Sequence, residues 1–143
     1  MIKTLPDKWV RDAVRDAINN MVVNGKTIPC YDTRVTGKSK RNYTLMTSQS
    51  NELANRTKCG DDWASSLLIE IYTSVKLAGN TGSRLLADNI LDKVRELTDT
   101  LTLDVASGLN IITQTPSFPN DLEATTNNEI IYRKFIRIEF LIE

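Results

Sequence analysis

Apolar residues recur every three or four positions between Pro6 and Val23, which is the spacing of an amphipathic helix. Pro6 suits a first helical turn, and Asp7 favours the positive end of the helix dipole. Asn24 and Gly25 tolerate the left-handed conformation that commonly ends a helix. The pattern therefore predicts a helix from Pro6 to Val23. A second apolar stripe of the same period predicts another helix from Ser83 to Leu97.

Strict alternation of apolar and polar residues predicts strands in two longer segments. From Trp63 to Val75, and again from Glu129 to Glu143, every second residue is apolar over most of the segment. The closing segment is the longer pattern, so we expect it to be a central strand. Shorter strands are predicted at Thr27–Tyr31, where Pro29 favours an edge strand or a strand end, at Tyr43–Thr47, at Leu101 and Leu103, and at Leu109–Thr115.

Polar segments between these patterns predict loops. Arg34–Asn42 contains Gly37 and reads as an exposed loop or hairpin tip. Ser48–Asp62 has few apolar anchors, and Lys76–Gly82 contains turn-forming residues before the second helix. Pro116–Asn128 has two prolines and clustered turn formers, which predicts a long exposed loop.

The order of elements is helix, strands, helix, strands, without the regular βαβ alternation of a doubly wound sheet. This order predicts an α+β fold: an antiparallel or mixed β-sheet with two amphipathic helices packed on one face. The chain has 143 residues, which is enough for one proper core. We therefore expect a single domain over residues 1–143.

Composition narrows the classes of function. Apolar residues make up 41% of the chain and charged residues 25%, as in ordinary globular proteins. Lysine plus arginine and aspartate plus glutamate number 18 each, so no global field would attract nucleic acid or an anionic membrane. The longest apolar runs fall far short of the roughly 20 residues that span a bilayer. Residues 1–6 lack the apolar stretch of a signal peptide, so we expect synthesis in the cytoplasm.

Candidate chemistry is sparse. The sequence contains no histidine, which removes the commonest general base and the commonest transition-metal ligand. Residues 77–84 join a strand to a helix with two glycines but lack the Gly-Lys-Ser/Thr ending of a phosphate loop. Asp61 and Asp62 are adjacent and would point to opposite sides of a strand, so with Glu70 they make no ligand pair. We expect no enzyme activity, no cofactor and no metal site.

Cysteine spacing indicates no redox or zinc chemistry. The two cysteines, Cys30 and Cys59, are far apart and form no CxxC pair. Buried, reduced thiols are the expectation for both.

One loop concentrates positive charge and therefore has two interpretations. Arg34, Lys38, Lys40 and Arg41 lie close together, and Tyr43 follows directly. The loop could be solvated surface or a contact with another protein. It could also follow a nucleic-acid backbone or line a channel, with Tyr43 as a stacking surface. Both interpretations stay open at this point.

The order of segments resembles the bacteriophage tail-terminator or tail-completion family, also described as head–tail joining or minor tail proteins. The matching segments are the opening helix WVRDAVRDAINNMV, the extended TIPCY, the strand LLIEIYTSVKLAG, the helix SRLLADNILDKVRELTD, the strand LNIITQT and the closing strand IIYRKFIRIEFLIE. They cover nearly the whole chain.

This resemblance implies a non-enzymatic virion protein that is assembled in the host cytoplasm. It would form a homo-oligomeric ring, a hexamer or dodecamer, at the head–tail junction or the tail end. Its partners would be neighbouring neck, portal or tail-tube proteins, with possible non-specific contact with DNA in the lumen. Arg34, Lys38, Lys40, Arg41 and Tyr43 would then form an interface or lumen loop. The alternatives are a nucleic-acid-binding α+β module that uses residues 34–43 and, more remotely, a metal-dependent enzyme using carboxylates.

Overall fold

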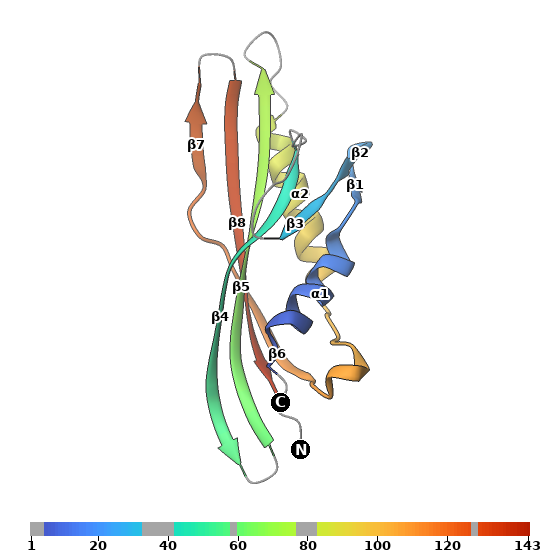
Figure 1. Ribbon diagram of the computed structural model, residues 1–143. Helices are drawn as coiled ribbons and strands as arrows, with labels where there is room; N and C mark the ends of the chain where they lie inside the picture. The colour runs from blue at the N-terminus through green and yellow to red at the C-terminus, as the bar shows by residue number, and fades with distance from the viewer. Residues whose placement is uncertain (1–4, 33–41, 58–59, 77–82, 127–128) are drawn as a thin grey trace.

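A long twisted sheet with two helices on one side forms the architecture of the computed structural model (Figure 1). The structure describes residues 5–32, 42–57, 60–76, 83–126 and 129–143. The helices are α1 (Asp7–Ile18) and α2 (Ser83–Thr98), with a 3₁₀ turn η1 (Val105–Ser107). The strands are β1 (Met21–Val23), β2 (Lys26–Ile28), β3 (Cys30–Asp32), β4 (Tyr43–Thr57), β5 (Gly60–Lys76), β6 (Ile111–Ser117), β7 (Leu122–Thr125) and β8 (Glu129–Ile142).

The main sheet is mixed and has the order β3-β4-β5-β8-β6, with β7 also paired to β8. Only β3 and β4 are parallel, and the other pairs are antiparallel. The strands β6 and β7 share one side of β8: β6 pairs with residues 137–142, and β7 pairs with residues 130–133. The predicted central position of the closing strand is confirmed, because β8 has partners on both sides. Separately, β1 and β2 form a small hairpin.

Both helices cover the same face of the sheet, so the predicted α+β class is confirmed (Figure 1). Helix α2 packs on β5 and β8, while α1 packs on β4, β5 and α2. The apolar stripes of both helices and the inward residues of the long strands form one buried cluster. Burying such side chains removes apolar surface from water, which is the main force that holds the helices on the sheet. Fully buried members are Val14, Ile18, Ile69, Ile71, Ile90, Val94, Ile136 and Ile142.

A lysine ties α2 to the edge of the sheet. The Lys134 ammonium on β8 lies 2.7 Å from Asp88 of α2 and 2.8 Å from Asp121, which precedes β7. Burial by itself would lower the pKa of Lys134, but the hydrogen bonds to Asp121 and Asp88 outweigh it and raise the pKa. The charge is therefore held at neutral pH and joins three segments that are distant in sequence.

The first helix is shorter than its apolar pattern predicts. It ends at Ile18, and Asn19 is extended with ψ 131°, while Asn20 has a left-handed φ of 59°. The Asn19 side chain then accepts a hydrogen bond from the Cys30 backbone N–H at 3.0 Å. The predicted helical residues Met21–Val23 instead form β1, with Met21 and Val23 buried. Helical spacing and strand alternation both suit these apolar residues, so the pattern by itself was ambiguous.

Asn24 and Gly25 end no helix; they turn the β1–β2 hairpin. Their φ values are 51° and 75°, the left-handed pair that a tight two-residue hairpin requires. Pro29 separates β2 from β3, and β3 is an edge strand, as the proline predicts.

Two predicted loops are largely strand. The segment Ser48–Asp62 continues β4 to Thr57 and starts β5 at Gly60, so the predicted short strand Tyr43–Thr47 is the beginning of a long one. Residues 116–128 contribute the end of β6 and all of β7. Polar side chains are compatible with strands here because they meet water. All residues of β7 are exposed, and the residues of β4 that follow Met46 are mostly polar. Alternation of apolar residues is therefore an incomplete signal.

Leu101 and Leu103 are buried but form no strand. They precede η1, which Asp104 caps by accepting a hydrogen bond from the Ala106 N–H at 2.9 Å. The predicted helix from Ser83 and the strands at 63–75 and 109–115 are confirmed with slightly different ends. The predicted loop 34–41 and the turn residues 77–82 lie outside the described part of the chain.

Candidate functional site: the open face of the sheet

The face of the sheet that points away from α1 and α2 is called here the open face. In the part of the chain that the structure describes, no helix covers it (Figure 1). Along β5, Leu67, Ile69 and Ile71 point to the helices and are fully buried, while Leu68 and Tyr72 point to the open face and are half-buried. Large side chains that stay half-exposed on an uncovered sheet mark a surface available for contact.

Three tyrosines from three neighbouring strands lie together at the β3 end of the open face. The rings of Tyr43 and Tyr72 are stacked with their centroids 4.6 Å apart, and Tyr31 meets Tyr43 edge-on at 5.6 Å. These are favourable aromatic geometries. Burial, followed by the charges of Tyr72 and Glu70, raises the pKa of Tyr43 to about 12, and burial also raises that of Tyr72. Both phenols are therefore neutral under ordinary conditions.

An ion pair between a buried carboxylate and a partly exposed arginine continues this cluster toward the middle of the sheet. The Arg133 Nε on β8 donates to the Glu70 carboxylate on β5 at 2.5 Å, and the Glu70 side chain is only 7% exposed. The Arg133 side chain is 40% exposed, and its guanidinium carbon lies 5.6 Å from the centre of the Phe135 ring. The hydrogen bond that Arg133 donates to Glu70 raises the pKa of Arg133. The pair satisfies a carboxylate that would otherwise be buried alone, which is costly.

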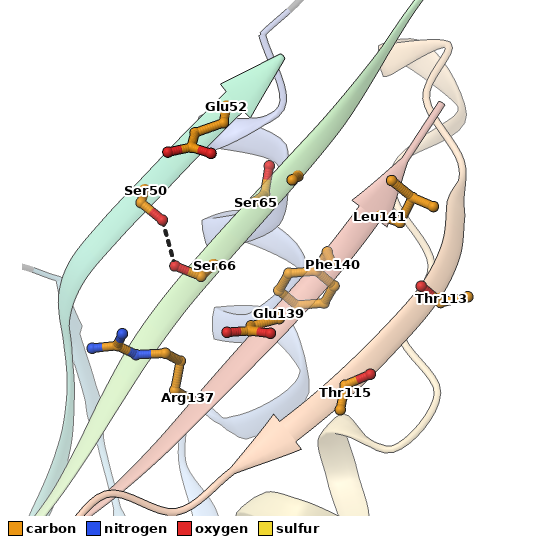
Figure 2. Close-up of a pocket in the computed structure, with 11 residues that line it drawn as sticks. Ser50, Glu52, Ser65, Ser66, Thr113, Thr115, Arg137, Glu139, Phe140 and Leu141 are labelled. Atoms are coloured by element: carbon orange, nitrogen blue, oxygen red, sulfur yellow. Dashed lines mark hydrogen bonds between the residues drawn. The ribbon is translucent and has the colours of Figure 1, made fainter. Parts of the chain in front are cut away.

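The other end of the open face holds a shallow hollow of about 440 Å³ that runs across four strands (Figure 2). Hydroxyl groups dominate its floor, and the Ser50 and Ser66 hydroxyls are 2.6 Å apart. Two carboxylates and one guanidinium stand around it. Its lining consists of Ser50, Glu52, Ala64, Ser65, Ser66, Thr113, Thr115, Arg137, Glu139, Phe140 and Leu141.

Among the side chains that the structure describes, the open face is suited to contact and shows no evident reaction centre. Glu70 is paired with Arg133, so it is no free base. Across the described residues, no group of three or more His, Cys, Asp or Glu side chains is placed to hold a metal ion. Cys30 is buried, and burial raises the pKa of its thiol. No helix in the described ranges is long and apolar enough to cross a bilayer.

The structure places one of the five residues that were predicted to form a contact loop. Tyr43 begins β4 and lies on the open face, with one ring face already stacked on Tyr72. The other four, Arg34, Lys38, Lys40 and Arg41, lie outside the described residues. The role of these four residues therefore stays a prediction. Tyr43 contacts Tyr31 and Tyr72 of the same chain.

The hollow was not predicted from the sequence. Arg137 and Glu139 are two residues apart on the closing strand that the alternation predicted, so they lie on the same face of it. Ser50 and Glu52, in contrast, come from the segment Ser48–Asp62, which was predicted as a loop, while Thr115 comes from the predicted strand Leu109–Thr115. Strand pairing brings them beside Glu139, and that pairing has no local signal in the sequence.

Comparison with known proteins shows the fold. No family model matches the chain, and no curated protein matches its sequence. Among solved structures, the chain is similar to a chain of the virion of a native gene transfer agent particle, with a TM-score of 0.61 and 13% sequence identity. The match covers 94% of this chain and 96% of that chain. At this identity the likeness establishes a shared fold over nearly the full length of both chains.

Proposed function

We propose that this chain is a non-enzymatic structural subunit of a phage-like virion. The observation that carries the proposal is the fold shared with a virion chain over 94% of this chain and 96% of that one. Because the match covers nearly the whole of both chains, a single shared motif does not explain it. The open face supports the proposal, because it offers a wide, uncovered contact surface without an evident reaction centre.

Within the virion, the subunit would form a ring at the head–tail junction or the tail end and so complete or connect the tail. Rings use heterologous contacts, in which two different patches of one subunit meet around a rotation axis. The ring would contain six or twelve copies and would stack on neck, portal or tail-tube proteins. It would be assembled in the host cytoplasm and reside in the virion.

The first test is the assembly state of the purified full chain. Light scattering after gel filtration should show a closed oligomer, and negative-stain micrographs should show rings with a central opening. If the chain needs a template, rings should form after addition of a neighbouring neck or tail-tube protein. A chain that stays monomeric by itself and binds none of these proteins would contradict the proposal.

The second test addresses the place in the virion. Loss of the gene should leave heads and tails unjoined, or tails of uncontrolled length, in micrographs of a lysate. Supplying the wild-type gene in trans should restore joined particles. Normal particles in its absence would exclude a role in completing or connecting the tail.

A further inference from the structure

The outer edge of β4 is open over a regular stretch. Strand β3 pairs only with Thr44–Met46, and no other described strand pairs with this side of β4 (Figure 1). Register shifts at Met46/Gln49 and Leu53/Asn55 leave five regular residues, Gln49–Leu53, between them. Natural edges are usually protected by lysine, proline or very short strands. This stretch contains neither residue, and its Leu53 side chain is 46% exposed.

The opposite edge of the same part of the sheet is β6. Strand β7 pairs further along β8, with Ile130–Arg133, and within the described ranges no strand pairs with the outer side of β6. Ile112 sits at the irregularity in this strand and is 47% exposed. Pro116 lacks an N–H group and ends the stretch that can donate to another strand. The usable edge is therefore Ile111–Thr115.

These two open edges lie at the same level of the sheet. Following the pairing across the strands, Ser50 aligns with Ser66, Glu139 and Thr115 in one row. By the same register, Glu52 shares a row with Thr113, and Leu53 shares one with Ile111. The open edges of β4 and β6 thus lie on opposite sides of the sheet, at the same level along the strands.

Strand direction is also compatible with joining the two edges. Three successive antiparallel pairs separate β4 from β6, so the two edges run in opposite directions. A rotation about an axis along the strands keeps these directions. A second copy placed by such a rotation therefore brings its β6 antiparallel to β4, which is the pairing that continues the sheet.

From this placement we propose that Ser50–Leu53 of one copy pairs with Ile112–Thr115 of the next copy, with Ser50 opposite Thr115. The occupant of the β4 edge is thus a second copy of this chain. The inference rests on the proposed ring and names the contact that closes it. In this register Ser50 meets the Thr115 hydroxyl and Leu53 meets the exposed Ile112, so a polar side chain meets a polar one and an apolar side chain meets an apolar one. The hydroxyl-rich hollow then continues from copy to copy.

Cysteine cross-linking tests the contact directly. The variant combines Ser50→Cys and Thr115→Cys in a chain with Cys59→Ser, and it keeps the buried Cys30. Directly opposed cysteines on antiparallel strands come close enough for a disulfide. Mild oxidation should give a ladder on a non-reducing gel that ends at the number of copies in the ring. The control pair Asp12→Cys and Asp92→Cys, at exposed sites on the two helices, should give no such ladder.

A charge experiment tests the same contact without cysteines. Ser50→Lys places a charge on the open edge and should move the protein from the ring peak to the monomer peak, with its circular dichroism spectrum unchanged. Adding Thr115→Glu to Ser50→Lys should restore the ring. The matched control is Ser66→Lys, in the same row and on the same face but on the central strand β5, and it should leave the ring intact. Both single changes remove the Ser50–Ser66 hydrogen bond.

The outcomes separate this inference from the proposed function. If the wild-type chain forms rings but the variant with Ser50→Cys and Thr115→Cys gives no cross-linked ladder, the edge contact is overturned and the ring stands. Rings unaffected by Ser50→Lys would give the same conclusion. A wild-type chain that forms no ring under any condition would overturn both.

Discussion

The two faces of the main sheet differ in how far their side chains are buried. On the helix-covered face, residues such as Ile69 and Ile136 are fully buried under α1 and α2. On the open face, neighbouring residues of the same strands remain half-exposed and pair among themselves, as Tyr43 does with Tyr72 and Glu70 with Arg133. The helices of the same copy cover the first face. No described helix covers the second face, and the strands at its two sides, β4 and β6, have open edges.

The largest expected difference between the faces comes from adjacent residues of β5. Ile69→Ala removes a side chain that is 0% exposed and leaves a cavity in the core, so it should lower the free energy of unfolding by about 3–4 kcal/mol. Leu68→Ala, one residue earlier on the open face, should cost about 1 kcal/mol, because the side chain is already partly in water. Urea unfolding of both variants measures the difference. Equal costs would mean that the open face is as well packed as the core.

The second effect concerns the ion pair of the open face. Arg133→Ala leaves the Glu70 carboxylate buried without its partner, and it should cost about 1–2 kcal/mol, less than for a pair with both partners fully buried because Arg133 is partly exposed. Arg137→Ala, on the same strand and face, should change the free energy of unfolding by less than about 0.5 kcal/mol. A cost for Arg133→Ala as small as that for Arg137→Ala would show that the pair contributes little.

A smaller effect should distinguish the open face at high pH. The pKa of Tyr43 is raised from 10.0 to about 12 in the folded chain, so its contribution to stability is complete below about pH 10 and is lost as the pH rises through 12. Free energies of unfolding of the wild type should therefore fall between these pH values. Tyr43→Phe removes the titrating group and should make this fall shallower than in the wild type. Parallel pH profiles for the two chains would contradict the assignment.

The smallest effect on stability is expected for the basic loop. Lys38→Ala, Lys40→Ala and Arg41→Ala together should alter the free energy of unfolding by less than about 0.5 kcal/mol if the loop is solvated surface. If the loop contacts DNA, the same variant should bind DNA more weakly and with a reduced dependence on salt. A charge-matched control with Lys8, Lys26 and Arg84 replaced by alanine should retain the affinity. Absent or salt-insensitive binding by the wild type would remove the nucleic-acid interpretation.

Much of the fold was predictable where one periodicity extended over many residues. The second helix, β5 and the central β8 follow their apolar patterns closely. The errors arose where the pattern was short or polar. Met21–Val23 suits either a helix or a strand, and only the left-handed Asn20 together with the pairing to Lys26–Ile28 decides for a strand. The second half of β4, from Gln49 onward, and the whole of β7 carry few apolar residues. The described side chains there are largely exposed to water, so these strands have no need of an apolar face.

The candidate surface was much less predictable. Of the residues singled out as a contact loop, only Tyr43 lies in the described part of the open face. The hollow, the tyrosine cluster and the ion pair each join residues from different strands. Their members belong to no shared local motif.

The sequence by itself determined which side chains alternate along each long strand and the α+β class, because periodicity depends only on neighbouring residues and backbone geometry. Tertiary structure alone decided which face the helices cover and which residues share a row. Glu70 and Arg133 are 63 residues apart and meet only through the register between β5 and β8. That register comes from hydrogen bonds between distant segments and from burial of one whole face, since a slip of one residue would turn every core side chain outward.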